Sequence, residues 1–119
     1  MFTTVLQVAL GGAIGASLRF GVGLAVAFPF GTLFVNVIGS FIMGLGFAYL
    51  TARGLDRLMP LLMTGVLGGF TTFSAFSLDT FKLIDAGRMG AAGGYVAGSV
   101  GLSIVALFAG VMLMKAIQG

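Results

Sequence analysis

Long apolar stretches separated by a few charged positions dominate the chain. No charged residue occurs within residues 2–18, 20–52, 58–78 or 89–114. A helix that crosses a bilayer needs about 20 predominantly apolar residues. Each of these stretches can supply most or all of one span. The stretch 20–52 is longer than one span requires. The pattern therefore predicts membrane-spanning helices joined by short polar turns.

The longest apolar stretch contains a helix boundary. Its Phe28-Pro29-Phe30-Gly31 segment divides it, because proline removes an amide donor and disfavours helix in the residue before it. We therefore predict an all-α integral membrane protein in which residues 1–119 form a single four-helix transmembrane domain. Short loops make neighbouring helices antiparallel, and the predicted helices cover about residues 3–26, 32–52, 57–84 and 89–117.

Composition makes lipid the expected solvent and narrows the function. Hydrophobic residues make up 59% of the chain and charged residues 8%, against about 45–50% and about 25% in soluble domains. Cysteine and histidine are absent, which excludes thiolate chemistry and the usual general base. No base, nucleophile dyad or metal triad is present, so we expect no enzyme. The scattered basic residues form no cluster, so we expect no nucleic-acid partner.

Positive charges are shared almost evenly between the two sides that four spans create. The positive-inside rule therefore gives no orientation. This near-tie predicts insertion in both orientations and an antiparallel homodimer, although mere scarcity of charge would produce it too. One side carries Arg53, Arg57 and Lys115, and the other carries Lys82 and Arg88 with Arg19 near it.

Small residues recur four positions apart in all four predicted helices. This spacing lets helix backbones approach closely in lipid, so we interpret these positions as packing seams, and their number favours an oligomer. They are Gly11 and Gly15, Gly12 and Ala16, Ser40 and Gly44, Gly65 and Gly69, and Gly90, Gly94 and Gly98.

The middle of the third predicted helix is its weakest part. Gly68 and Gly69 are followed by a run of hydroxyl residues that begins at Thr71. In membranes, freed backbone groups are tolerated where protein or water satisfies them, and carbonyls at helix breaks coordinate cations. A sodium ion on the carbonyls of Gly68 and Thr71 is one interpretation. A continuous helix whose hydroxyls bond to the preceding turn is the other, and these residues alone leave both open. For the fold as a whole we predict that the third helix is interrupted near its middle.

An aromatic stripe follows this weak point. Phe70, Phe73 and Phe76 recur every three residues and are predicted to share one face. Aromatic stripes at this spacing usually pack against neighbouring helices. Here Thr72 and Ser74 lie between the phenylalanines, so the stripe can also line a polar space. The edge of an aromatic ring is positive, so ring edges can attract an anion weakly enough to let it move on.

Two polar stripes at helical spacing accompany the phenylalanines. They serve either as interhelical hydrogen bonds or, beside the aromatic stripe, as an anion path. The first is Thr32, Asn36 and Ser40, and the second is Tyr95, Ser99 and Ser103.

Two ionisable residues occur in or near spans. Arg19 follows the apolar body of the first helix, where it is either a functional group or a side chain that reaches the nearer interface. Asp79 is expected at the exit of the third helix as an interface charge.

Over essentially its whole length the chain resembles the Fluc (CrcB) family of microbial fluoride channels. Three motifs occur in order and at the right spacing. They are Gly11-Gly12-Ala13-Ile14-Gly15-Ala16-Ser17-Leu18-Arg19-Phe20, Gly31-Thr32-Leu33-Phe34-Val35-Asn36-Val37-Ile38-Gly39-Ser40-Phe41 and Gly68-Gly69-Phe70-Thr71-Thr72-Phe73-Ser74-Ala75-Phe76-Ser77.

The resemblance implies a dual-topology antiparallel homodimer in a bacterial inner membrane, with two fluoride pathways along the subunit interface. It implies passive fluoride export without a further protein partner. The implied pathway residues are Phe73, Phe76, Asn36, Arg19, Tyr95, Ser99 and Ser103, and the carbonyls of Gly68 and Thr71 are implied to hold a structural sodium ion. The chain departs from the common pattern at Ala75, where a hydroxyl is frequent, and at Asp79, where glutamate is usual.

Two alternatives have different functions. A small dual-topology multidrug exporter would need a buried carboxylate in the first helix, and this helix has none. A structural membrane subunit without transport would explain the glycine seams but not the weak third helix with its aromatic stripe.

Overall fold

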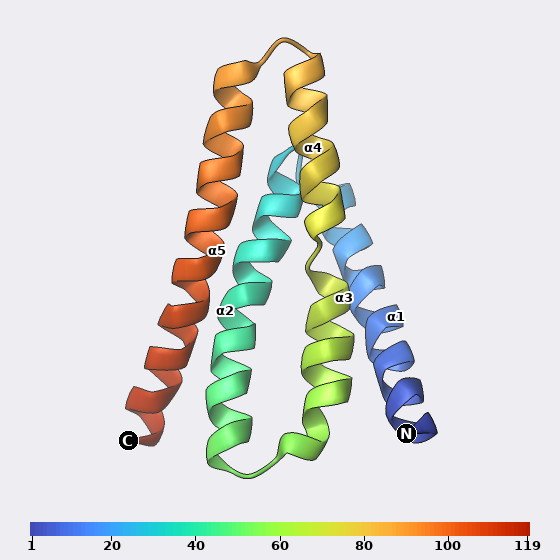
Figure 1. Ribbon diagram of the computed structural model, residues 1–119, viewed down its shortest axis with the longest axis vertical. Coiled ribbons are helices and arrows are strands. Elements are labelled where there is room, and N and C mark those ends of the chain that lie inside the picture. The colour runs from blue at the N-terminus through green and yellow to red at the C-terminus, as the bar shows by residue number, and fades with distance from the viewer.

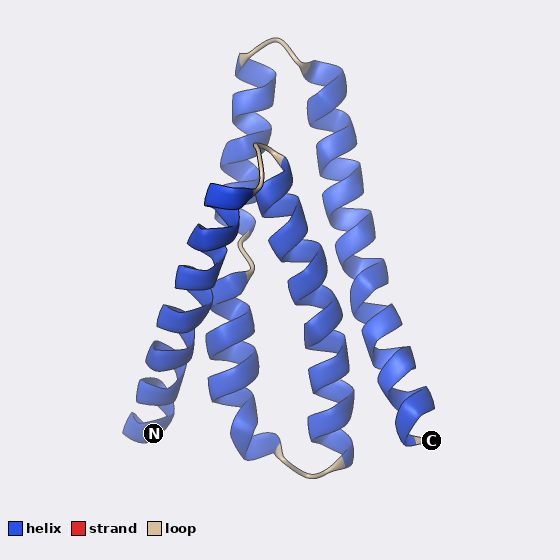
Figure 2. Ribbon diagram, turned by 180° about the vertical axis from the view of Figure 1, so that it is seen from behind, coloured by secondary structure: helices blue, strands red, loops and turns tan.

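The computed structural model describes residues 1–119, and every element in it is a helix (Figure 2). In chain order these are α1 (Phe2–Ala25), α2 (Phe30–Ala52), η1 (Asp56–Leu58), η2 (Pro60–Leu67), α3 (Gly68–Phe70), α4 (Phe73–Asp85) and α5 (Met89–Gln118). Four stretches are long and apolar enough to cross a membrane, with η1 to α4 counting as one. The prediction of an all-α, multi-pass membrane protein is confirmed.

Helix ends lie close to their predicted positions. The turn between α1 and α2 falls at the predicted proline, and Pro29 occupies the position just before α2. There the ring costs nothing, because the first amides of a helix have no intrahelical partner. α2 therefore begins at Phe30, two residues earlier than predicted.

The third span consists of several helical pieces. Pro60 begins η2, a π-helix that continues into α3. Thr71 and Thr72 then take extended backbone conformations, and α4 starts at Phe73. We predicted a third helix over about 57–84 that is interrupted near its middle, and the structure has two helical halves joined by two extended residues (Figure 1).

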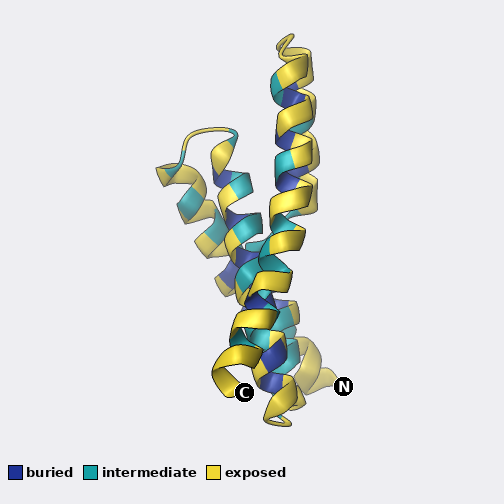
Figure 3. Cartoon of the chain, turned by 90° about the vertical axis from the view of Figure 1, so that its left-hand side faces the viewer, coloured by how far each residue is buried: buried dark blue, intermediate teal, exposed yellow.

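The four spans pack as two pairs. α2 packs along α5, and α1 packs along η2 and α3. The turn between α1 and α2 and the α4–α5 hairpin separate at one end of the molecule, as Figure 3 shows from the side. The break in the third span lies where these two parts diverge (Figure 1).

Glycine permits a close approach of the α2 and α5 backbones. A Cβ at Gly44 would overlap the Leu107 carbonyl oxygen, and one at Gly110 would overlap the Phe41 carbonyl oxygen. These two backbones therefore touch, as the seam at Gly44 predicted. No helix of the same chain approaches Gly90, Gly94 or Gly98, since a Cβ at any of them would meet no atom within 4 Å, so a packing role for these three glycines stays a prediction.

Little of the chain is buried, as expected for a protein with lipid on its outside. Seventeen of 119 residues are buried, and many large apolar side chains are exposed. Exposed positions occur along every long helix (Figure 3). The one buried apolar cluster lies between α4 and α5 and contains Phe76, Leu83, Ala92 and Tyr95. This cluster fixes the half of the third span that follows the break.

Candidate functional site

The break in the third span is held by a side chain from α2. The amide of Asn36 accepts a hydrogen bond from the Thr72 backbone N–H at 2.7 Å and donates one to the Thr72 carbonyl at 3.0 Å. Both backbone groups of an extended residue are thereby satisfied at membrane depth, where an unpaired group would be costly. Asn36 thus clamps the break and retains one N–H for another partner.

Threonine hydroxyls cap the helical halves on both sides of the break. Thr71 Oγ1 donates to the Leu67 carbonyl one turn earlier at 2.9 Å. Thr72 Oγ1 accepts from the Ala75 N–H at 3.1 Å and so caps the start of α4. Backbone-bonded hydroxyls, the feature expected of a continuous helix, therefore coexist with the extended residues.

Arg19 contacts the end of α3 beside the break. Its Nε donates to the Gly69 carbonyl at 3.0 Å, and the residue is half-buried. This bond satisfies one of the carbonyls that the end of α3 leaves without a helical partner. Of the two interpretations of Arg19, the structure supports an interior position beside the break.

The two carbonyls predicted to hold a cation lie at the end of α3, where backbone carbonyls have no helical partner. A helix leaves its last four C=O groups without intrahelical partners, and α3 ends at Phe70 with Thr71 extended. Gly68 and Thr71 fall at this end, and Gly68 is exposed. Backbone oxygens are suitable ligands for a hard cation, so the residues present fit the expected sodium ion.

A cavity of about 260 Å³ lies directly beside the break. It brings together three of the predicted elements: the α2 polar stripe, the start of α4 and the α5 stripe. No acidic or basic side chain lines it. Its lining residues are Asn36, Ser40, Thr71, Thr72, Phe73, Phe76, Ser99, Val100, Ser103 and Ile104.

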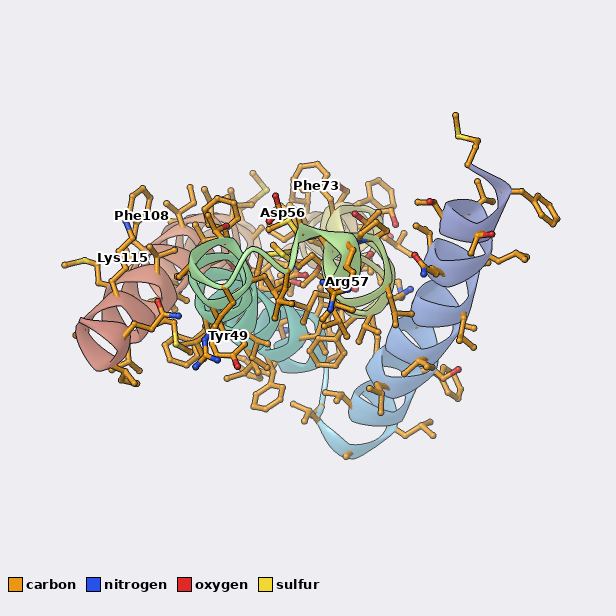
Figure 4. The ribbon with its side chains drawn as sticks, turned by 90° about the horizontal axis from the view of Figure 1, so that it is seen from below. Tyr49, Asp56, Arg57, Phe73, Phe108 and Lys115 are labelled. Atoms are coloured by element: carbon orange, nitrogen blue, oxygen red, sulfur yellow. The ribbon has the colours of Figure 1, made fainter.

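Three aromatic rings stack beside this cavity. The Phe73 and Phe76 centroids are 5.4 Å apart with the rings tilted by 51°, and Phe76 and Tyr95 are 5.4 Å apart and tilted by 38°. Phe76 is buried, whereas Phe73 is 75% exposed and lies at the outer edge of the molecule (Figure 4). The prediction that Phe70 shares their face was wrong, because the break separates them and Phe70 packs near Gly39.

Two serine hydroxyls on the cavity wall have no partner in the chain. Ser99 Oγ and Ser103 Oγ are buried and make no hydrogen bond, and the Ser99 residue is only 4% exposed. A buried hydroxyl without a bond is costly. Two such groups one helical turn apart on one wall leave two hydroxyl donors free for an acceptor inside the cavity.

Asp79 is buried, so the expectation of an interface charge was wrong. It is 8% exposed, and the Tyr95 hydroxyl donates to its Oδ2 at 3.1 Å. The partner comes from α5, sixteen positions away across the α4–α5 turn, so the charge pattern along one helix could not reveal it. This bond orients Tyr95, which therefore packs on Phe76 and does not line the cavity itself.

The remaining predicted residue, Thr32, lies elsewhere. It lines a second crevice of about 310 Å³ together with Arg19, Gly31 and Ala75. The α2 stripe is therefore split, with Asn36 and Ser40 at the cavity and Thr32 at the crevice. Thr72 borders both spaces, and sequence reasoning gave it no role of its own.

Comparison with known proteins decides the family. The family described as CrcB-like protein, Camphor Resistance (CrcB), matches residues 6–111. The chain belongs to the CrcB family. The predicted resemblance is confirmed, and it covers the cavity, the break and all four spans.

Relatives that match over 90% or more of both chains carry a functional name. A protein of Cereibacter sphaeroides named fluoride-specific ion channel FluC is 53% identical over 125 residues, covering 100% of this chain and 98% of that protein. Proteins with the same name are 54% identical in Paracoccus denitrificans, over 90% of each chain, and 49% identical in Ruegeria sp., over 98% of each chain. These CrcB relatives are named as channels, which confirms that the chain is not an enzyme and argues against the multidrug exporter.

Proposed function

We propose that this CrcB protein is a fluoride-selective ion channel that lets cytoplasmic fluoride leave the cell passively. The observation that carries the proposal is the cavity beside the break, where phenylalanine rings meet serine hydroxyls that have no partner in the chain. The names of relatives about half identical in sequence support the choice of anion.

The lining suits a small anion that must keep moving. Ser99 and Ser103 can donate hydrogen bonds, and the free N–H of Asn36 adds a third donor. The start of α4 lies at the cavity and contributes the positive end of a 13-residue helix. The Phe73 and Phe76 ring edges attract an anion only weakly, so the ion binds and then leaves.

The pathway is completed by a second copy of the chain. Phe73 is 75% exposed although it borders the cavity, so one wall of the site is missing in the single chain. The open face of α5 at Gly90, Gly94 and Gly98 offers close approach to another helix. We place two copies in an antiparallel, dual-topology homodimer with a pathway on each side, and no other protein partner is needed.

A structural sodium ion lies between the two copies in this proposal. The Gly68 and Thr71 carbonyls of each copy supply oxygen ligands to it. When sodium is replaced throughout purification by N-methylglucamine, a cation too large for such a site, fluoride efflux should fall and return on adding sodium. Equal efflux in both cations would contradict a structural role for sodium.

The channel works in the bacterial inner membrane, where acid stress turns fluoride into a toxin. Neutral HF crosses lipid inward and ionises in the cytoplasm, and the anion then returns through the channel. The protein contributes no energy, so the fluoride gradient alone drives export.

Substituting the two phenylalanines tests this assignment. Phe73→Ile and Phe76→Ile should each lower fluoride efflux from reconstituted liposomes at least tenfold, which corresponds to about 1.4 kcal/mol of lost pathway stabilisation. The dimer should survive on a sizing column. Phe108→Ile is the matched control, because Phe108 is 61% exposed on α5 and does not line the cavity. Wild-type efflux from both cavity variants would reduce the aromatic pair to packing.

A further inference from the structure

An apolar groove lies between α2 and η2, away from the anion cavity. Its volume is about 500 Å³, within the roughly 300–1,000 Å³ typical of ligand pockets. It shares no lining residue with the cavity. Its walls include Ile42, Tyr49, Leu58, Leu62, Met63 and Val66.

The groove follows from how the spans pair. α2 packs mainly along α5 and η2 along α1, so α2 and η2 contact each other only sparsely. Both walls belong to spans long and apolar enough to cross a membrane. From Ile42 to Tyr49 the α2 wall is about 10 Å long at 1.5 Å per residue. The groove therefore runs within the membrane towards the turn between α2 and η1.

Positive charge lies at the mouth of this groove. The Arg53 guanidinium lies 5.0 Å from the centroid of the Tyr49 ring, and Tyr49 lines the groove. Arg57 follows in η1, next to Leu58 of the groove wall. Seen from below, Asp56 lies towards the Phe73 side, whereas Arg57 and Tyr49 lie further from it (Figure 4). In this view Asp56 therefore lies on the side away from Tyr49, the groove residue that Arg53 contacts.

We propose that this groove holds an acyl chain of an anionic phospholipid whose phosphate is bound by Arg53 and Arg57. Guanidinium groups bind phosphate through paired hydrogen bonds. Tyrosine is favoured at the level of lipid headgroups, and basic residues beside a span attract anionic lipids. A zwitterionic lipid offers the same chain, but its head carries no net charge for the arginines to recognise.

The site stays open to lipid when the dimer forms. Tyr49 lies on the side of the molecule away from Phe73 (Figure 4), and Phe73 marks the face where we place the second copy. In an antiparallel dimer the two grooves open at opposite membrane surfaces, so each leaflet supplies one lipid. The inference rests on the groove and its charges and does not depend on fluoride conduction.

A fluorescent reporter tests the proposal directly, because the chain contains no tryptophan. The full-length Tyr49→Trp variant keeps an aromatic ring for Arg53 and places one fluorophore in the groove wall. It is reconstituted in phosphatidylcholine liposomes with increasing fractions of phosphatidylglycerol or phosphatidylcholine brominated in the acyl chains. We expect brominated phosphatidylglycerol to reach half-maximal quenching at a several-fold lower mole fraction than brominated phosphatidylcholine.

Phe108→Trp is the matched control. Phe108 is exposed on α5, and Lys115 follows about two turns later on the same helix, so this position combines a cation on its own helix with an open helix surface. The two lipids should quench this reporter equally. Adding Arg53→Gln and Arg57→Gln to Tyr49→Trp should abolish the preference. If these variants do not fold, the comparison of Tyr49→Trp with Phe108→Trp still tests the proposal.

Three results would overturn the proposal. Equal quenching of the Tyr49→Trp reporter by both lipids would show a groove without headgroup recognition. The same preference at Phe108→Trp would show diffuse attraction of anionic lipid to the basic surface. Absence of quenching by either lipid at Tyr49→Trp would show that protein covers the groove.

Discussion

At the scale of single residues, the two unpartnered serines allow a functional role to be tested separately from a structural one. Ser99 Oγ and Ser103 Oγ are buried without a hydrogen bond in the chain. Their removal therefore breaks no bond within the fold, although it removes two donors from the cavity. Most polar residues in membrane spans do not allow this separation, because their interhelical bonds stabilise the fold as well.

We expect Ser99→Ala to leave stability unchanged and to impair conduction. The thermal midpoint in detergent should stay the same or rise, since an unsatisfied hydroxyl disappears. Fluoride efflux from liposomes should fall about tenfold, because a hydrogen bond to a charged group is worth about 1.5–3 kcal/mol. Ser77→Ala is the control, since Ser77 is exposed and bonds to the Phe73 carbonyl. A drop in stability without a drop in efflux would make Ser99 structural.

The position of a side chain could be predicted only as far as the spacing along its own helix decides it. The α5 serines could be identified from spacing, and both line the cavity. Asn36 could be identified as polar in a span, but its two bonds to Thr72 join residues 36 positions apart. The same limit hid Asp79, whose Tyr95 partner lies on the next helix. One sequence carries no record of such pairings.

At the scale of elements, the close α2–α5 contact holds the cavity walls together. These helices carry Asn36 and Ser40 on one side and Ser99 and Ser103 on the other. Their backbones meet at Gly44 and Gly110, where any side chain would overlap the neighbouring backbone. The position of the hydroxyls relative to the Asn36 clamp therefore depends on two glycines at the far end of the same pair of helices.

Gly110→Val should separate α2 from α5 and lower stability by about 1–3 kcal/mol, the usual cost of overpacking. The thermal midpoint in detergent measures this change, and efflux should fall with it. Gly21→Ala is the control, because a Cβ there meets no atom within 4 Å, and it should be neutral or stabilising by up to about 1 kcal/mol. Equal midpoints for the two variants would contradict the close contact.

The elements themselves were more predictable than their interruptions. Charge-free stretches and Pro29 placed all four spans, since hydrophobic length and a missing amide act locally. The predicted weak point centred on Gly68 and Gly69, whereas the extended residues are Thr71 and Thr72. Glycine weakens a helix wherever it stands. The break falls instead at Thr72, where the Asn36 amide from α2 forms hydrogen bonds with the freed backbone N–H and C=O. That position depends on tertiary structure.

At the scale of the whole molecule, several features of the single chain have no partner within it. Few residues are buried, one face of α5 is open at Gly90, Gly94 and Gly98, and Phe73 projects outward beside a cavity that needs a further wall. The near-tie in positive charge allows both orientations in the membrane. The proposed antiparallel pair explains these features together.

Anion efflux from liposomes that contain the purified wild-type protein tests the central claim most directly. Vesicles loaded with fluoride or with chloride are diluted into ion-free buffer, and ion-selective electrodes follow the release. The account predicts rapid fluoride release over that from protein-free vesicles, with chloride retained. Fluoride release no faster than from protein-free vesicles, or equal release of both anions, would contradict it.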